Sequence, residues 1–480
     1  MKKMFKELRF YFISIYAILN ILVIAQMIIA KMIPMKYIAV VSIVLVIIFL
    51  CMYFIQYGKR TNKVNKILGK ILIILLSALL GVGNLYLFKT YSTFNKIAGD
   101  NTEKIQVSIV VMKSSGFEKI KDLDGKAFGM VSIGDTKYAD QTLTKLESEL
   151  GTNTTTQAYN GFDVFAEGLY SGEVDAMILN EGYRGMFEDN HPSFGEDTKI
   201  IKTYTYEEKS KDTSKAVDVT KEPFLVYISG IDTFGSISTV SRTDVNKIMA
   251  INPQSKQILL IDIPRDYYVP QTCQGNQKDK LTHTGIFGVS CTIDSVSNFF
   301  GEDINYYARV NFSSLVDIVD ALGGITVNSD YAFTGVGHSF VAGSNELNGE
   351  QALAFSRERY SLSGGDNERI KNQTRVLSGI INKVTSPSII GNYMGLMSAV
   401  GGTFQTNMSD SDISSLVNMQ LSDMSGWNIT DYAVGGTGGT DWTPANGFNA
   451  YVMYPDTNTV TKAKQLIAQL KNGEVPTVTE

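Results

Sequence analysis

Three long stretches without charge occupy most of the first fifth of this 480-residue chain. Residues 10–30 and 37–57 each run 21 residues without a charged side chain, and residues 71–88 run 18. A helix of about 20 apolar residues crosses a hydrocarbon core of about 30 Å. We therefore expect three membrane-spanning helices. A cleaved signal peptide is the competing interpretation, but three spans without a convincing small-residue cleavage site argue against it.

The distribution of basic residues predicts the orientation of these helices. Only Lys31 and Lys36 flank the first hairpin. The basic residues before the first span and between the second and third are Lys2, Lys3, Lys6, Arg9, Lys59, Arg60, Lys63 and Lys66. The positive-inside rule then places the N-terminus in the cytoplasm. Because the number of spans is odd, we expect everything after about residue 90 to be extracellular.

An extracellular location permits a disulfide between Cys273 and Cys291. An oxidising compartment allows such a pair, and closing this short loop contributes roughly 3 kcal/mol in the chain-entropy model. Two free buried thiols are the alternative. A zinc site is not indicated, because the cysteine spacing is wrong and His283 is the only histidine nearby.

The polar remainder divides into two predicted domains. We predict a membrane region over residues 1–100, a small α/β accessory domain over 101–215 and a larger domain over 216–480. The first domain alternates strands and helices, and its "SGEVDAMI" run weakly resembles one lobe of periplasmic solute-binding proteins. Residues 206–223 are charged and poor in apolar side chains, which is typical of a linker.

The larger domain has the pattern of a layered α/β fold. Residues 224–229 and 257–263 are expected to be buried strands, with a helix over 244–251 between them. Further helices are expected over 293–300, 312–322, 349–355 and 367–384. The glycine-rich stretch 435–439 follows no helix-opening phosphate pattern and is expected to be a loop.

Arginine is concentrated in the first part of this larger domain. Seven of the ten arginines fall between positions 242 and 375, namely Arg242, Arg265, Arg309, Arg357, Arg359, Arg369 and Arg375. Arginine provides a planar, bidentate grip on phosphate or carboxylate, so the clustering points to an oxyanion ligand. The net charge of −5 gives no support to nucleic acid as a partner.

Two aspartates stand beside these arginines. Asp232 follows a predicted strand and a glycine, and Arg242 and Asp244 open the predicted helix. Such aspartates are most often turn or capping residues. Beside arginines they are also suited to Mg²⁺, which takes one or two carboxylates together with phosphate oxygens. Arg265 directly follows the strand 257–263, so its guanidinium leaves the sheet at a strand end.

Two further patterns point to a lipid phosphate. Arg357 and Arg359 are two residues apart, and in an extended chain both would point to one face; they are either a solvated pair or a site for an anion. Along the helix 367–384, one face carries Arg369, Gln373, Val376, Leu377 and Ile380. This face is either that of an amphipathic core helix, or it binds a head group at Arg369 and Gln373 and an apolar tail farther along.

Conventional hydrolase motifs are missing from the sequence. The three histidines, His191, His283 and His338, have no metal-binding spacing, and there is no GxSxG elbow, Walker loop or catalytic Cys/His pattern. Acid–base chemistry by histidine is therefore not expected.

Four ordered motifs resemble one known family. The runs beginning "GIDTFGSISTVSRTDVN", "NYYARVNFSSLVDIVDALGG", "LNGEQALAFSRERY" and "GDNERIKNQTRVL" resemble the catalytic domain of the LytR-CpsA-Psr wall-polymer ligases over about residues 224–385. The three spans and the accessory domain resemble the capsule-associated CpsA members. The chain departs from the family pattern at Asp262, where serine is more usual, and over residues 281–291.

The resemblance implies a layered α-β-α domain with a mixed central sheet and a pocket for a polyisoprenyl phosphate. Asp232 and Asp244 would hold Mg²⁺, and Val376, Leu377 and Ile380 would line the lipid pocket. The residues that would bind phosphate oxygens are Arg242, Arg265, Arg357, Arg359, Arg369 and Gln373. Among these, Arg242 and Arg265 would also act in catalysis with Asp232.

The function implied is that of a Mg²⁺-dependent phosphotransferase in a Gram-positive cell envelope. It would move a glycopolymer, expected to be capsular polysaccharide, from undecaprenyl diphosphate to a peptidoglycan hydroxyl, with Asp232 accepting the proton. The alternatives are a non-catalytic sensor or scaffold of lipid-linked polymer and a lipid diphosphate hydrolase. A transcriptional regulator conflicts with the predicted topology, because too little chain is cytoplasmic for a DNA-reading fold.

Overall fold

The computed structural model describes most of the chain. The described residues are 2–97, 102–132, 136–187, 190–231, 237–359, 361–362, 364–389, 396, 399 and 404–478. Asp232, the first of the two predicted metal ligands, lies outside them.

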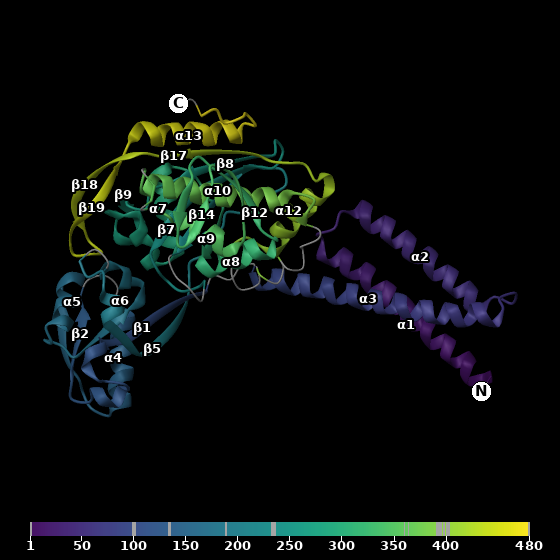
Figure 1. Cartoon of the computed structure of the whole chain (residues 1–480), viewed down its shortest axis with the longest axis horizontal. Coiled ribbons are helices and arrows are strands. Elements are labelled where there is room, and N and C mark those ends of the chain that lie inside the picture. The colour runs from purple at the N-terminus through teal and green to yellow at the C-terminus, as the bar shows by residue number, and fades with distance from the viewer. Residues whose placement is uncertain are drawn as a thin grey trace.

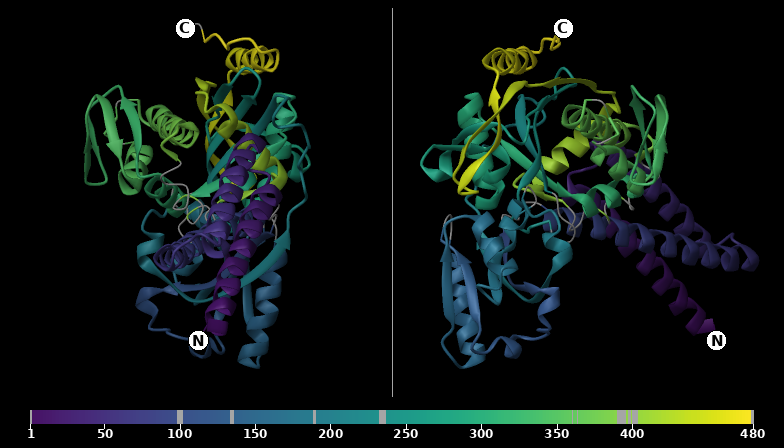
Figure 2. Two further views of the ribbon diagram at one scale, coloured as in Figure 1. Left: turned by 90° about the vertical axis from the view of Figure 1, so that its right-hand side faces the viewer. Right: turned by 60° about the vertical axis from the view of Figure 1, so that its left-hand side comes forward.

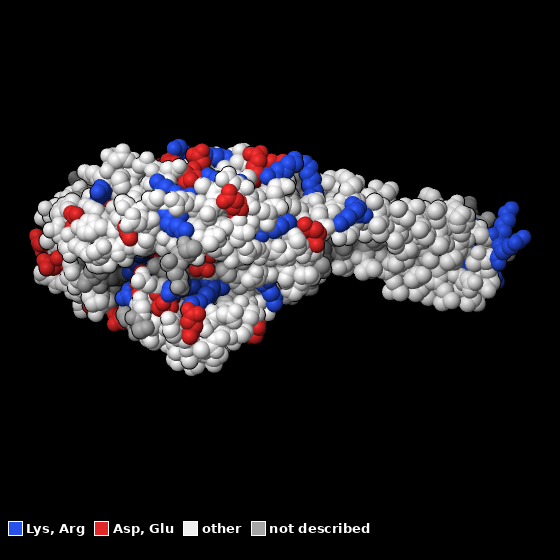
Figure 3. All heavy atoms as spheres, turned by 90° about the horizontal axis from the view of Figure 1, so that it is seen from above, with Lys and Arg blue, Asp and Glu red and all other residues white. Residues whose placement is uncertain are grey.

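Three long apolar helices extend from the globular part of the molecule. They are α1 (Lys2–Ala30), α2 (Met35–Tyr57) and α3 (Lys63–Ile97), and each contains a stretch long and apolar enough to cross a membrane. They project together to one side (Figure 1). Figure 3 shows a shaft without charge that ends in Lys and Arg, at the end away from the globular part. The three predicted spans are thus confirmed as helices.

The loop between α1 and α2 is docked on the globular part. Ala30 and Met32 are buried in a hydrophobic cluster of the C-terminal domain. The carbonyl of Lys31 accepts a hydrogen bond from Asn418 Nδ2 at 2.9 Å, and Lys36 Nζ donates to the carbonyl of Ser422 at 2.6 Å. Both partners lie on α12 (Asp410–Asp423). The connection between α1 and α2 is therefore bound to α12 of the C-terminal domain.

The accessory domain is a separate α/β unit with its own sheet. Its strands are β1 (Thr102–Met112), β2 (Ala127–Val131), β3 (Thr155–Tyr159), β4 (Ala176–Asn180) and β5 (Thr198–Lys209), in the spatial order β3-β2-β4-β1-β5. Helices α4 (Lys137–Leu150) and α5 (Phe162–Tyr170) pack against the sheet. Because β5 pairs with β1 as far as Lys209, the expected linker from residue 206 begins too early.

The C-terminal domain is built on a six-stranded mixed sheet. Its strands are β6 (Phe224–Ile231), β7 (Thr243–Asn252), β8 (Gln257–Asp262), β11 (Tyr306–Asn311), β16 (Gln405–Thr406) and β17 (Asn428–Ala433), in the order β16-β11-β6-β7-β8-β17. The β6-β7 and β7-β8 pairs are antiparallel, whereas β6-β11 and β8-β17 are parallel. The expected mixed sheet is confirmed.

Helices cover both faces of this sheet. On one face, α7 (Val289–Phe300) and α13 (Thr457–Lys471) share a core with Tyr227, Ile248 and Leu259. On the other face, α10 (Asp366–Thr385) and α12 pack against Val226, Ile228 and Leu260. The result is the expected α-β-α layering, seen from two further sides in Figure 2. The accessory domain and the membrane helices leave this domain in different directions (Figures 1 and 2).

Two expectations about local structure are wrong. Residues 244–251, expected to be a helix, form most of strand β7. The apolar residues here have helical spacing, at Val245, Ile248, Met249 and Ile251. A central strand that is covered on both faces, however, carries apolar side chains on both faces, so its sequence does not alternate between apolar and polar residues. The stretch 435–439, expected to be a loop, runs into strand β18 (Gly436–Thr443), which pairs with β19 (Phe448–Pro455).

The remaining predicted helices are present with small changes at their ends. They are α7, α8 (Phe312–Ala321), α9 (Gly349–Arg357) and α10. Asn311 and Asn348 cap α8 and α9 by accepting from the backbone nitrogens of Ser314 and Gln351, each at 2.9 Å. A disulfide between Cys273 and Cys291 fixes the start of α7 to a preceding loop.

Candidate functional site

A cavity of about 430 Å³ lies between the central sheet and three helices of the C-terminal domain. Its sheet side is formed by β6, β7 and β11, through Ile228, Val245 and Ala308 among others. Its helical side is formed by α8, α9 and α10. This is enough space to enclose part of an elongated ligand.

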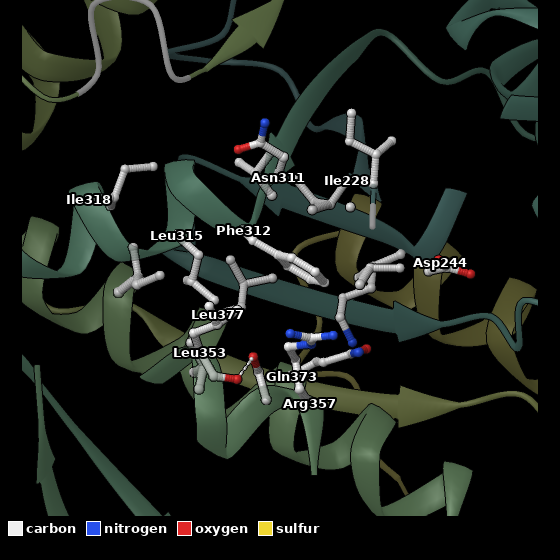
Figure 4. Close-up of a pocket in the computed structure, with 18 of the residues that line it drawn as sticks. Ile228, Asp244, Asn311, Phe312, Leu315, Ile318, Leu353, Arg357, Gln373 and Leu377 are labelled. Carbon is white, nitrogen blue, oxygen red and sulfur yellow. Dashed lines mark hydrogen bonds between the residues drawn. The ribbon is translucent and has the colours of Figure 1, made fainter. Parts of the chain in front are cut away.

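The cavity has a charged end and an apolar end. In Figure 4, Arg357 and Gln373 lie together on the side of Asp244, whereas Leu315, Ile318 and Leu377 lie at the other end. The charged side chains that line the cavity are Asp244, Lys247, Arg265, Arg357, Arg359 and Arg369. Cationic groups therefore outnumber the single carboxylate, and the cavity favours an anionic group attached to an apolar one.

The first charged contact joins Arg265 to Asp244. Strands β7 and β8 are antiparallel neighbours, so the start of β7 lies next to the residues that follow the end of β8. Arg265 Nη1 donates to Asp244 Oδ1 at 2.8 Å there. The other oxygen, Asp244 Oδ2, is buried and accepts no hydrogen bond from the described residues.

The electrostatic surroundings keep Asp244 ionised. Burial alone would raise the pKa of this carboxyl, but the positive charges of Arg242, Arg265 and Arg369 outweigh burial, and the pKa is lowered. The same attraction acts on Arg265. Burial would lower the pKa of its guanidinium, but the negative charges of Asp244 and Asp266 raise this pKa. Arg265 and Asp244 therefore form a charged pair with one carboxylate oxygen left over.

Arg369 is largely buried next to other arginines, and the carboxylate of Asp366 pairs with it. It lies in the first turn of α10, where its Nη2 is 2.5 Å from Asp366 Oδ1. Burial lowers its pKa, Asp366 opposes this, and nearby Arg265 and Arg359 lower the pKa further. Its Nε is buried without a hydrogen-bond acceptor among the described residues. An anion placed at this end of the cavity would satisfy both deficits.

Arg357 and Arg359 reach the cavity from the end of α9. Arg357 is the last residue of that helix, and its guanidinium lies 4.1 Å from the centre of the Phe312 ring. This cation–π contact holds the guanidinium at the border between the charged and apolar ends. Arg359 follows Glu358, whose backbone is extended, and also lines the cavity.

The predicted lipid-binding face of α10 also lines the cavity. Gln373, Val376, Leu377 and Ile380 all contribute to its wall, in the order expected from their helical spacing. Sequence reasoning missed the apolar side chains that face them, which are Phe312, Leu315, Ile318 and Phe404. The amphipathic pattern of residues 312–322 was a signal for these, but it did not say whether the apolar face meets a core or a cavity.

Lys247 was missed as well. It lines the cavity, is 2% exposed, and donates to Asp262 Oδ1 on the neighbouring strand. Thr374 of α10 joins the pair, because its hydroxyl donates to Asp262 Oδ2 at 2.6 Å and accepts from Lys247 Nζ at 2.7 Å. This network includes Asp262, one of the two places at which the chain departs from the pattern of the resembled family.

Three of the seven clustered arginines do not line the cavity. Arg309 is buried and its Nη1 is 3.4 Å from Glu103 Oε1, and Arg375 pairs with Asp330. Arg242 is not among the residues that line the cavity. Its guanidinium lies against Gly185 of the accessory domain. The positive charge of Arg242 nevertheless lowers the pKa of Asp244, against the effect of burial.

Two family models match parts of this chain. The model of the LytR_cpsA_psr family matches residues 193–466, more than half of the chain, and a model described as NMT1/THI5 like matches residues 98–221. The crystal structure of Bacillus subtilis TagU is 31% identical with a TM-score of 0.42 and covers 54% of this chain and 100% of that one.

Two curated relatives share the name polyisoprenyl-teichoic acid–peptidoglycan teichoic acid transferase TagU. The protein from Enterococcus faecalis is 39% identical over 215 residues, which are 44% of this chain and 70% of the relative. The protein from Bacillus licheniformis is 38% identical over 207 residues, 43% of this chain and 67% of the relative. The narrower resemblance to CpsA members remains a prediction, but the chain belongs to the LytR-CpsA-Psr family.

Proposed function

We propose that this protein transfers a glycopolymer from a polyisoprenyl diphosphate carrier to a hydroxyl of peptidoglycan. The observation that carries the proposal is the cavity with four arginines at one end and an apolar wall at the other. The family and the names of the curated relatives support the same activity. Undecaprenyl diphosphate is the carrier that we expect.

The two ends of the cavity suit the two parts of such a carrier. Val376, Leu377 and Ile380 offer apolar surface to the polyisoprenyl tail, and burial of such surface contributes about 25 cal/mol per Å². Arg265, Arg369 and their neighbours offer guanidinium groups to the diphosphate oxygens. Tail and head group are thereby held in one orientation relative to the acceptor.

The reaction is a displacement at phosphorus. The acceptor hydroxyl oxygen forms a bond to the sugar-linked phosphorus, the bond from that phosphorus to the bridging oxygen breaks, and polyisoprenyl monophosphate leaves. The hydroxyl proton passes to a base, for which we propose Asp232. Arg265 and Arg369 stabilise the charge on the phosphate oxygens, which is the main protein contribution to phosphoryl transfer.

Asp244 is suited to hold Mg²⁺ in this site. Its Oδ2 is buried without a donor among the described residues, as a metal-binding oxygen would be, and Mg²⁺ takes few carboxylates when phosphate oxygens complete its shell. The described residues contain no group of three or more His, Cys, Asp or Glu side chains that could form a site alone. Asp244 and Asp232 would hold the ion, which would neutralise diphosphate charge.

The membrane region sets where this chemistry takes place. We propose that the basic loop at residues 59–66 is cytoplasmic, which places the accessory and C-terminal domains outside the cell. The site then faces the leaflet that carries exported lipid-linked polymers, next to the wall. Labelling of single cysteines introduced at the α1–α2 loop, by a reagent that cannot cross the membrane, tests this orientation.

The polymer itself is open to two proposals. The CpsA-like arrangement of three spans and an accessory domain favours capsular polysaccharide, whereas the curated relatives are named for teichoic acid. The two are separated by supplying the full-length protein with each polymer on a polyisoprenyl diphosphate and measuring which is transferred faster.

The activity is tested with the full-length protein in detergent or nanodiscs. Lipid-linked polymer, Mg²⁺ and peptidoglycan fragments should give polyisoprenyl monophosphate and a phosphodiester-linked product, both detected by mass spectrometry. Release of monophosphate without a linked product would identify a hydrolase instead. Tight binding of the carrier without any release would identify a sensor or scaffold.

A further inference from the structure

The segment 238–242 connects the accessory domain to the candidate site. Lys104 of β1 donates its backbone N–H to Ser238 O at 2.7 Å, and Val240 donates to Lys104 O at 3.0 Å. Thr239 therefore pairs with Lys104 as in a parallel sheet. The segment ends two residues before Asp244, so its position bears on the charged end of the cavity.

Side chains of both domains fix this segment. Val240 is 6% exposed and belongs to the hydrophobic core of the accessory domain. The carbonyl of Thr239 accepts from Arg309 Nη2 at 3.2 Å, and Arg309 in turn pairs with Glu103 of β1. The backbone before Arg242 is thus held by contacts with both the accessory domain and the C-terminal domain.

The accessory domain also contacts the Arg242 side chain itself. Gly185 lies in the short helical stretch Glu181–Phe187, and the Arg242 guanidinium occupies the space beside its Cα. A methyl group on Gly185 would lie 2.5 Å from both Cζ and Nη2 of Arg242 and 2.6 Å from Nε. These distances are shorter than van der Waals contact, so only a residue without a Cβ allows the guanidinium to lie there.

We propose that the accessory domain completes the phosphate site by seating the Arg242 guanidinium on Gly185, which makes Gly185 a positioning residue for transfer. This inference rests on the proposed function and on a role for Arg242 in it. The guanidinium is the far end of a flexible side chain, so a methyl group would displace it at little cost to folding. A displacement of about 1 Å at a reacting site costs up to about 100-fold in rate.

Gly185→Ala in the full-length protein tests the proposal, with Gly195→Ala as the matched control. Gly195 lies in α6 (Phe194–Asp197) of the same domain, and a methyl group there would meet no described atom within 4 Å. Both variants should unfold at the temperature of the wild type. We expect Gly185→Ala to lower kcat/KM for polyisoprenyl monophosphate release by about tenfold or more, and Gly195→Ala to leave it within about twofold of wild type.

A double-mutant cycle separates positioning of Arg242 from any other effect of Gly185. Arg242→Ala should lower kcat/KM, and adding Gly185→Ala to that variant should cause no further loss, because no guanidinium remains to be displaced. An equal loss in both backgrounds would overturn the proposal, as would full activity of Gly185→Ala beside an impaired Arg242→Ala. Full activity of Arg242→Ala would remove its basis, while an inactive wild type would overturn the proposed function instead.

Discussion

Lys247 and Asp262 face each other as direct register partners on β7 and β8, and both are almost fully buried. Their ion pair, with the hydroxyl of Thr374, ties two strands to α10 beneath the cavity. Asp244 lies three residues before Lys247, Arg265 lies three residues after Asp262, and Gln373 precedes Thr374. The network therefore joins β7, β8 and α10, three of the elements that carry the charged end of the site.

Lys247→Met should destabilise the protein strongly. It leaves the Asp262 carboxylate buried without its partner, and breaking a buried pair in this way costs about 3–5 kcal/mol. Chemical denaturation followed by circular dichroism measures the change. The double variant Lys247→Met with Asp262→Leu should recover most of the loss, since apolar replacement of a buried pair is often neutral. Wild-type stability of the single variant would contradict a buried charged pair.

Arg265→Lys should remove most activity while the protein folds normally. Lysine keeps the charge but loses the planar fork, which contacts Asp244 and in the proposed reaction also a phosphate oxygen. Loss of one such donor costs about 100-fold or more in kcat. Arg375→Lys is the matched control, because Arg375 pairs with Asp330 and does not line the cavity. Near-normal turnover of Arg265→Lys would argue against bidentate contact with phosphate.

Leu377→Ser should weaken binding of a long-chain polyisoprenyl phosphate about tenfold or more. The side chain lines the apolar end of the cavity, and removing a buried leucine from contact with the tail costs about 1.5–3 kcal/mol. Calorimetric titration with phosphates of increasing chain length provides the measurement. The shortest ligands, which reach only the arginines, should bind both proteins equally; a uniform loss would place the tail elsewhere.

The Asp244 carboxylate should support folding at neutral pH and cease to do so in acid. Its pKa in the folded protein lies below the ordinary value, so its contribution is fully present above the unfolded pKa of about 4 and is lost as pH falls through the folded value. The stability difference between wild type and Asp244→Asn should therefore be constant from pH 8 to about pH 5 and shrink below about pH 4. A stability difference between the two proteins that grows as pH falls would show that the pKa of Asp244 is raised in the folded protein and not lowered.

The sequence predicted those parts of the site in which side chains of one element share a face. Arg369, Gln373, Val376, Leu377 and Ile380 lie on one helix, and helical spacing alone brings them to one wall of the cavity. Arg265 was placed at a strand end for a similarly local reason. Such patterns depend on the backbone geometry of a single element and need no knowledge of its neighbours.

Features that depend on two elements were not predictable in this way. Strand β7 was mistaken for a helix because its burial on both faces comes from layers that the sequence does not display. Lys247 was overlooked because its partner Asp262 is 15 residues away and becomes adjacent only through strand register. The contact of Arg242 with Gly185 arises from docking of two domains, for which no local pattern exists.

The α1–α2 loop, hydrogen-bonded to α12, gives the C-terminal domain a second point of attachment besides the chain that follows α3. Two points of attachment restrict the rotation of a domain relative to the membrane helices more than one point does. In the proposed orientation, this second contact would keep the arginines at a constant distance from the outer surface of the membrane. The proposed transfer would then select carriers whose diphosphate reaches that distance, and glycan strands in the innermost layer of the wall.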